Sequence, residues 1–334
     1  MNKHRGTLSG ILARGERKSP LAFWLGTIAV IAGVGLHLPM FFASAGMGYM
    51  MAGMPMDATM LVGMALIVAG TGAVAFGLIP ASRSFAAPPS AESVSVPDSD
   101  AGDRLTRAHG LLMLTLIFAL IVDTMKPASL GFIVPGMAQE YGLRSPLNPA
   151  GAVPVAYLPL SGIAGTVLGS FLWGWLGDRI GRRASILFAG IIFIGTSICG
   201  SMPGYIWNFV MCFIMGLGVG GMLPITYALL AEAIPARHRG WLMVVIGGDI
   251  AGAYIITSWL ASALVPTFSW RILWLLGAPT GVLMVLLNRW IPESPRYLLA
   301  SGREAEARAV MDRYGAMIVE ERSELEVEKD VKSR

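Results

Sequence analysis

The chain has 334 residues, of which 54% are hydrophobic and only 14% are charged. A soluble globular protein has about 25% charged residues, so this composition excludes an ordinary water-exposed surface and predicts a polytopic membrane protein. The formal net charge of +4 does not indicate a nucleic-acid partner, because the basic residues form short clusters between apolar runs rather than one patch.

Eight segments are apolar enough to cross a bilayer, since a spanning helix needs about 20 mostly apolar residues. They are residues 21–43, 59–80, 108–134, 153–176, 184–203, 206–232, 241–265 and 271–291. The first is too long for a signal peptide, lacks a clear small-residue cleavage site and is soon followed by a second span, so we interpret it as an anchor. We therefore predict an all-α fold with about eight transmembrane helices.

The lysines and arginines alternate between the connecting segments. Residues 1–20 carry five of them, residues 81–107 three, residues 177–183 three and residues 235–240 two, whereas residues 44–58 carry none. Cytoplasmic loops of membrane proteins are enriched in Lys and Arg. The alternation therefore predicts a multi-pass protein of the inner (plasma) membrane, with both termini in the cytoplasm.

Composition also divides the chain along its length. The stretch 84–106 is rich in Pro, Ser, Ala and acidic residues and poor in large apolar ones, which is typical of a disordered linker. We predict a basic cytoplasmic tail (1–20), a two-helix membrane leader (21–83), the cytoplasmic linker (84–106), a six-helix membrane domain (107–292), and a cytoplasmic amphipathic helix ending at Gly315 with a charged tail (293–334).

Three motifs lie in the loops that carry basic residues. The loop after the fourth span, GWLGDRIGRR, contains Gly174, Asp178, Arg179, Gly181, Arg182 and Arg183. A glycine at position 181 permits a tight turn, and the arginines hold the loop on the cytoplasmic side. The stretches AEAIPARHRG and IPESPRYLLASGR supply Glu232 with Arg239, and Glu293 with Arg296.

Together these motifs resemble the cytoplasmic loops of the major facilitator superfamily, in its sugar-porter-like and organic-solute branches. The resemblance covers residues 107–315 and implies the N-terminal half of that fold, with six helices in two inverted three-helix repeats. It also implies that the acids and bases of the motifs form an ion-pair cluster that locks the outward-facing state, so we assign them to conformational gating. The chain departs from the family in three respects: the two leader helices are extra, the second half is absent, and Cys212 replaces a common arginine.

The resemblance implies secondary active transport of a small sugar- or organic-acid-like solute by alternating access, and we expect it to be proton-coupled. Asp123 and Asp249 lie inside predicted spans, where an ionisable side chain costs about 2.5–3.5 kcal/mol on insertion scales and usually serves a purpose. Lys126 follows Asp123 on the same helical face, and Tyr227 is a further cavity-lining residue. We assign these four residues to substrate or proton coupling. The alternative is structural, with Asp123 paired to Lys126 and Asp249 bonded to backbone.

Other interpretations stay open. The chain is a half-transporter that needs a second copy or a partner chain, or a truncated membrane protein that transports nothing. A third class is Cu(I) handling through the outer loop, because thioethers bind Cu(I), although methionine also fills irregular apolar gaps. The methionines of that loop are Met47, Met50, Met51, Met54 and Met56.

We expect no enzymatic activity, since the sequence has no nucleophile–base pair and no phosphate-binding Gly-Lys-Ser/Thr loop. We expect no cofactor and no metal site, and we interpret Cys199 and Cys212 as packing residues. The expected partners are the lipid bilayer, a small-molecule solute, protons, and either a second copy of the chain or the missing C-terminal half.

Overall fold

The all-helical membrane architecture is confirmed by a computed structural model, which describes residues 19–79, 93–95, 105–315 and 317–319. Eight helical segments are long and apolar enough to span a membrane: Pro20–Met47, Ala58–Leu78, Arg107–Glu140, Tyr157–Ile180, Arg182–Ser201, Tyr205–Ala233, Arg237–Phe268 and Ile272–Trp290. Their ends lie within six residues of the predicted ones. Nearly all of the predicted basic tail, most of the linker and the end of the charged tail lie outside the described residues.

Several spans consist of more than one helical element. The α-helices are α1 (Pro20–Gly35), α2 (Leu38–Ala43), α3 (Ala58–Leu78), α4 (Arg107–Glu140), α5 (Tyr157–Ile180), α6 (Arg182–Thr196), α7 (Tyr205–Val219), α8 (Met222–Ala233), α9 (Ala236–Gly247), α10 (Asp249–Phe268), α11 (Ile272–Leu275), α12 (Gly277–Leu287), α13 (Pro295–Ala300) and α14 (Glu304–Tyr314). Short 3₁₀ helices are η2 (Ser44–Met47), η3 (Ser197–Ser201) and η4 (Asn288–Trp290), and the strands are β1 (Ser93–Ser95) and β2 (Met317–Val319).

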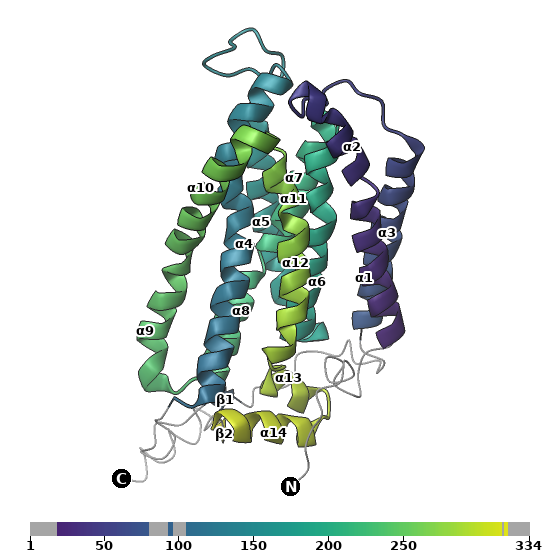
Figure 1. Ribbon diagram of the computed structural model, residues 1–334. Coiled ribbons are helices and arrows are strands. Elements are labelled where there is room, and N and C mark those ends of the chain that lie inside the picture. The colour runs from purple at the N-terminus through teal and green to yellow at the C-terminus, as the bar shows by residue number, and fades with distance from the viewer. Residues whose placement is uncertain (1–18, 80–92, 96–104, 316, 320–334) are drawn as a thin grey trace, which may run out of the picture.

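The spanning helices stand side by side in one upright bundle (Figure 1). α1 and α3 form a hairpin at one side of the bundle, and α13 and α14 lie across its lower end, where β1 and β2 pair antiparallel. We call this lower end, which holds the turns at residues 181, 234–235 and 291–294, the motif end. The opposite end, which holds residues 141–156, is the far end.

Local sequence explains where several helices begin and end. The Ser19 hydroxyl accepts a hydrogen bond from the Ala22 N–H at 3.1 Å, and the Asp57 carboxylate accepts one from the Met60 N–H at 2.8 Å. Such N-cap side chains satisfy N–H groups that have no partner within the helix. The predicted amphipathic helix is α14, and it ends as expected at Gly315, whose φ of +67° is a left-handed conformation that favours glycine.

Glycine holds the two leader helices at backbone contact distance. A Cβ atom at Gly26 would meet the carbonyl oxygen of Gly70 at 2.5 Å, and one at Gly33 would meet that of Gly63 at 2.6 Å. Lipid tails are as apolar as the helices, so helix association in a bilayer relies on close packing rather than on a hydrophobic driving force. The leader hairpin therefore depends on a seam of small residues.

The span made of α6 and η3 is the central element of the bundle. Within its most apolar window 89% of the residues are buried, against 28–50% in the other spans. α1 and α3 pack against α6, as does α12 of the body. One apolar cluster therefore joins leader and body, with Phe23, Val30, Ile67 and Val74 from the leader and Leu187, Ile191 and Ile194 from α6.

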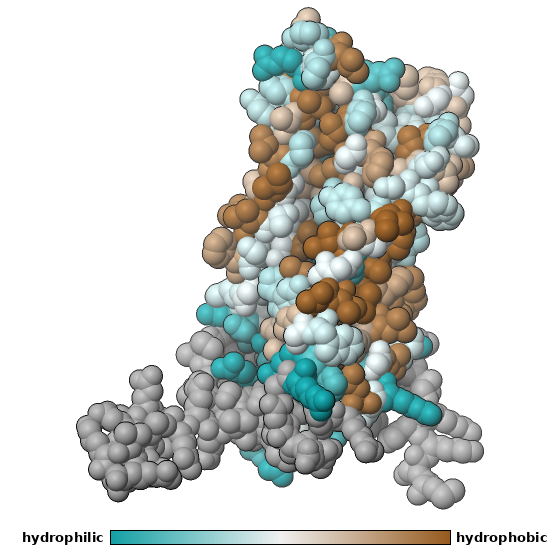
Figure 2. Space-filling view, turned by 90° about the vertical axis from the view of Figure 1, so that its left-hand side faces the viewer, coloured by the Kyte–Doolittle hydropathy of each residue, from teal (hydrophilic) through white to brown (hydrophobic). Residues whose placement is uncertain are grey.

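The outer surface between the two ends is apolar. Large exposed side chains on α5, α9 and α10 include Ile163, Phe171, Val244, Ile255 and Trp259. Figure 2 shows apolar side chains gathered over the middle of the face formed by α9 and α10, with hydrophilic residues at its lower end. Such a surface suits contact with lipid tails, since helices satisfy their own backbone hydrogen bonds.

Gly70 and Gly72, two residues apart on α3, offer a matched test of the glycine seam. A Cβ at Gly70 would meet the Gly26 carbonyl oxygen at 2.7 Å, whereas nothing lies within 4 Å of a Cβ at Gly72. We expect Gly70→Ala to lower the free energy of unfolding by about 1–3 kcal/mol, the usual cost of overpacking. Gly72→Ala should leave it unchanged or raise it slightly. Thermal unfolding in detergent measures both, and equal effects would contradict the seam.

Candidate functional site

A carboxylate holds the turn between α5 and α6 at the motif end. Gly181, which joins the two helices, has a φ of +93°, a conformation that favours glycine. Oε1 of Glu293 accepts hydrogen bonds from the backbone N–H of Arg182 at 2.8 Å and of Arg183 at 3.2 Å. These are N–H groups at the start of α6, where negative charge is favourable. Burial raises the pKa of the Glu293 carboxyl, and these hydrogen bonds and the charge of Arg183 oppose that rise.

A second carboxylate connects the three sequence motifs. Glu232 at the end of α8 pairs with Arg182, with 2.7 Å between Oε1 and Nη1. Its other oxygen accepts a hydrogen bond from the Ser294 hydroxyl at 2.6 Å, and the Ser294 N–H donates to Glu293 Oε1 at 3.1 Å. The motifs recognised in the sequence therefore meet in one network, which links the start of α6, the end of α8 and the start of α13.

Two further gating residues lie beside this network. Asp178 and Arg296 are exposed, and together with Arg182 they line a shallow cavity of 140 Å³. Arg296 also interacts electrostatically with Glu232. Within the described residues Asp178 forms no ion pair, so the carboxylates that hold the motifs together are Glu232 and Glu293.

The other residues assigned to gating make different contacts. The Arg179 guanidinium lies 4.3 Å from the centre of the Trp175 ring. Nε of Arg239 donates to the Ile234 carbonyl oxygen at 2.9 Å, which holds the turn between α8 and α9. Gly174 lies on α5 with open space around the position of a Cβ. These contacts lie apart from the hydrogen bonds of Glu232 and Glu293.

Inside the membrane-spanning region, the structure brings Asp123 and Asp249 together. Asp123 lies on α4, Asp249 begins α10, and these two helices pack against each other. The two residues are 3% and 6% exposed. Oδ1 of Asp123 and both carboxylate oxygens of Asp249 have no hydrogen-bond partner among the described groups. The predicted structural alternative for Asp249, a bond to backbone, is therefore wrong.

The predicted pairing of Asp123 with Lys126 is also wrong. Nζ of Lys126 donates to the Phe193 carbonyl oxygen on α6 at 3.4 Å, and no ion pair joins Lys126 to Asp123 in the described part of the chain. The reason is the position of the neighbouring helices. The lysine fills space that Gly277 leaves open on α12, so its ammonium group points toward α6 and α12. A cavity of 20 Å³ beside Lys126 has room for about one water.

Two other residues singled out in the sequence, Tyr227 and Cys212, make neutral contacts between helices in the structure. Tyr227 on α8 is half-buried, and its hydroxyl lies beside Gly247 of α9. The Cys212 thiol is free and buried, and it donates to the Leu158 carbonyl oxygen at 3.4 Å. Cys212 therefore makes a neutral contact between α7 and α5, at the position where the family resemblance leads one to expect a charged side chain.

The methionines of the outer loop differ in burial. Met51 is fully buried, and Met54 and Met56 pack against the apolar cluster that joins the leader to α6. Met47 and Met50 are both 51% exposed. Within the described residues no group of three or more His, Cys, Asp or Glu is placed to hold a metal ion. Met51, Met54 and Met56 therefore fill apolar gaps, whereas capture of Cu(I) by the thioethers of the loop stays a prediction.

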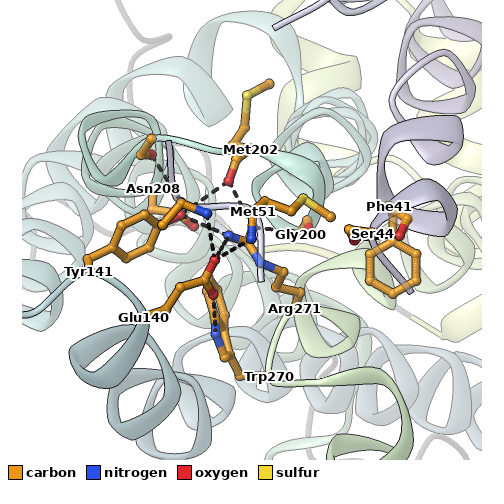
Figure 3. Close-up of polar contacts among 12 residues, drawn as sticks. Phe41, Ser44, Met51, Glu140, Tyr141, Gly200, Met202, Asn208, Trp270 and Arg271 are labelled. Atoms are coloured by element: carbon orange, nitrogen blue, oxygen red, sulfur yellow. Dashed lines mark hydrogen bonds and ion pairs between the residues drawn. The ribbon is translucent and has the colours of Figure 1, made fainter. Parts of the chain in front are cut away.

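A buried ion pair that sequence analysis missed lies at the far end (Figure 3). Nη2 of Arg271, between α10 and α11, lies 2.6 Å from Oε1 of Glu140 at the end of α4, and the side chains are 0% and 3% exposed. Glu140 also accepts hydrogen bonds from the N–H groups of Met51 at 2.7 Å and Ala52 at 3.0 Å, and from Trp270 Nε1 at 3.1 Å. One carboxylate thus connects the leader loop to two helices of the body.

The Arg271 guanidinium also donates hydrogen bonds to a backbone carbonyl oxygen and to a tyrosine hydroxyl. Nη1 of Arg271 donates to the Met202 carbonyl oxygen at 2.8 Å, and Nη2 donates to the Tyr141 hydroxyl at 3.0 Å. Burial raises the pKa of Tyr141 to about 12, so its hydroxyl stays protonated and donates to the Met202 oxygen at 3.2 Å. Sequence offered one signal for this network: Glu140 and Arg271 are charged residues beside long apolar segments, outside the basic clusters.

Comparison with known proteins agrees with this architecture. The sugar (and other) transporter family matches residues 154–333, which is more than half of the chain. The chain therefore belongs to this family of multi-pass membrane transporters, and the predicted resemblance to the major facilitator superfamily is confirmed.

The chain matches only part of the length of its individual relatives. The chain is 34% identical over 155 residues to the organic cation/carnitine transporter 7 of Arabidopsis thaliana, which is 46% of this chain and 31% of that protein. It is 29% identical over 228 residues to the 4-hydroxybenzoate transporter PcaK of Acinetobacter baylyi, which is 67% of this chain and 48% of that protein. The chain thus spans less than half the length of these two relatives, both of which are transporters and not enzymes.

Solved structures show the same fold. The proton:xylose symporter XylE from E. coli matches 61% of this chain and 49% of its own, with a TM-score of 0.54 and 20% identity. The similarity covers about half of the symporter chain, in agreement with the six-helix half predicted from the sequence.

The far-end ion pair gives a stability prediction. We expect Glu140→Gln or Arg271→Met to lower the free energy of unfolding by about 3–5 kcal/mol, because each leaves a buried charge without its partner. The double variant should lose less free energy of unfolding than the two single variants lose when their losses are added. The matched control is Glu304 and Arg308 of α14, an ion pair whose side chains are 68% and 73% exposed, which should contribute less than about 1 kcal/mol. A double-mutant cycle with no coupling between Glu140 and Arg271 would contradict this role.

Proposed function

We propose that this chain forms one six-helix half of a proton-coupled secondary transporter of a small organic solute, which works by alternating access. The observation that carries the proposal is the pair of buried carboxylates on α4 and α10. An ionised carboxylate away from water is costly unless it is paired, and a bound proton removes that cost. Asp123 and Asp249 have free carboxylate oxygens in such a place, so a proton can bind and leave there as the site is exposed to either side.

The buried positions of Asp123 and Asp249 also lead us to propose a second six-helix unit. The cavity beside Lys126, of 20 Å³, is too small for an organic solute. A transport cavity would instead form where a second six-helix unit covers α4 and α10. That unit would supply the remaining wall of the solute path, and a second copy of this chain is one candidate for it.

The class of solute follows from the relatives. Their names assign xylose, 4-hydroxybenzoate and organic cations or carnitine to them, so we propose a small polar organic solute of the sugar or organic-acid kind. Cys212 leaves one common cationic position neutral, which favours an uncharged or singly charged solute. We further propose that the motif end faces the cytoplasm of a bacterial-type inner membrane, since its loops carry the basic clusters.

At the motif end, the network of Glu232 and Glu293 is suited to gating. Its ion pair between Arg182 and Glu232 is 14% and 9% exposed, so water reaches it and the pair is weaker than one in a sealed interior. A contact of this strength can hold one state and still break in each transport cycle.

The native mass of the full chain in lipid nanodiscs separates the competing interpretations. A dimer, or a complex with a second six-helix chain, is expected if the buried carboxylates line a closed path. A monomer that shows no uptake would favour the non-transporting alternative and overturn transport by this chain.

Proton coupling is tested by Asp123→Asn and Asp249→Asn. We expect each variant to lose solute-driven proton uptake while still inserting, because Asn cannot bind and release a proton at this site. Proteoliposomes with an internal pH dye report uptake when D-xylose, 4-hydroxybenzoate or carnitine is added. Asp312→Asn, a matched change at an exposed position of α14, should behave like the parent chain. Normal coupled uptake in both intramembrane variants would remove Asp123 and Asp249 from the mechanism.

Gating is tested by Asp178→Asn. Because Asp178 lines the cavity that also contains Arg182 and Arg296, we expect its neutralisation to slow the conformational cycle, so that counterflow of labelled solute falls while solute affinity stays unchanged. Glu304→Gln, at another exposed acid of the motif end, is the control. Counterflow at the full rate would exclude a gating role for Asp178.

A further inference from the structure

A pocket of 280 Å³ lies at the motif end, where the leader meets the surface helices. Five parts of the chain line it: the end of α3, the junction of α5 and α6, the segment from η4 to Glu293, α13 and α14. Its volume is near the lower limit for small-ligand sites, which hold about 300–1,000 Å³. The pocket therefore has room for a compact polar group, and it depends on the leader for part of its wall.

The charged residues of the pocket are mostly cationic. Four arginines line it, Arg183, Arg289, Arg303 and Arg313, against two acids, Glu293 and Glu306. Both acids already have partners. Glu293 accepts the N–H groups at the start of α6, and Glu306 forms a two-fold hydrogen-bonded pair with Arg303, at 3.1 and 2.6 Å.

Two of the arginines are available for a ligand. Within the described residues, Arg289 and Arg313 form no ion pair. Their guanidinium groups instead lie 3.9 Å from the centre of the Trp290 ring and 5.7 Å from that of the Tyr314 ring. A cation–π contact restricts the guanidinium, and both arginines are exposed, so their N–H donors are accessible. A planar fork of this kind matches the oxygen atoms of a phosphate.

The pocket lies at the boundary between lipid and water. The span of α3 ends at Leu78 and the last span ends at Trp290, and both residues line the pocket. Tryptophan is enriched at this level of membrane proteins. Leu78, Ile180 and Val310 add apolar surface next to the cationic groups. A ligand with an anionic head and apolar chains fits this combination, whereas a freely soluble anion would leave the apolar wall exposed.

We propose that this pocket binds the phosphate of an anionic phospholipid headgroup, with Arg289 and Arg313 as the principal phosphate ligands. The acyl chains would run along the end of α3, and the bound lipid would connect the leader with α13 and α14. The choline of a zwitterionic lipid would place a cation among arginines, so the pocket selects for a net negative headgroup. This site is independent of the proposed transport activity.

The test uses the full chain in detergent and native mass spectrometry of its lipid adducts. Phosphatidylglycerol and phosphatidylcholine with identical acyl chains are the probes. We expect the first phosphatidylglycerol to bind about tenfold more tightly or better than phosphatidylcholine. The variant Arg289→Gln/Arg313→Gln should lose that preference. Arg308→Gln, which removes one positive charge of α14 outside the pocket, should keep it. Equal preference in the two variants, or none in the parent chain, would overturn the site.

Two further measurements keep the proposal testable. Arg313→Gln alone changes an exposed side chain in the last turn of α14, so folding is retained, and it should weaken phosphatidylglycerol binding on its own. Hydrogen exchange of α13 and α14 in the parent chain should slow when phosphatidylglycerol is added. Displacement of the lipid by an equal concentration of inorganic phosphate would assign the pocket to a soluble phosphate compound and overturn the lipid source.

Discussion

The absence of water in the bilayer core constrains every part of this structure. Backbone groups there must find partners within the chain, so the spanning segments are helices. The same constraint places charge at the two ends of the bundle and makes each internal charge costly. The exceptions are therefore informative. Asp123, Lys126 and Asp249 are all less than 7% exposed, and only the lysine has a hydrogen-bond partner for its charged group among the described residues.

At both ends of the bundle, a carboxylate accepts hydrogen bonds from backbone N–H groups, and an ion pair between glutamate and arginine lies in the same network. At the far end, Glu140 accepts backbone N–H groups of the leader loop and pairs with Arg271. At the motif end, Glu293 accepts the N–H groups of α6, and neighbouring Glu232 pairs with Arg182. The two sites differ in solvent access, because the Arg271 side chain is 0% exposed and that of Arg182 is 14% exposed. The far-end pair thus suits a permanent connection, and the motif-end pair suits one that opens.

The leader hairpin is held together by its glycine seam and is joined to the family fold at two places. Its apolar face packs on the central helix α6, and its outer loop is bound by Glu140. At the motif end, Leu78 contributes to the arginine-lined pocket. The leader is therefore an integral part of the bundle, and a lipid bound in that pocket would add a further connection.

Sequence alone determined the spans, the three loop motifs and the intramembrane acids. Runs of apolar residues and the positions of Arg, Asp and Glu can be read from the local sequence. Insertion into a bilayer depends directly on these local properties. Tertiary structure decided the partners. Glu140 meets Arg271 from 131 positions away, because α4 and the turn before α11 come together at the far end. Lys126 turns to the Phe193 carbonyl rather than to Asp123 because Gly277 leaves it space. Helical spacing shows which side chains share a face, but only the packed neighbours determine which contact forms.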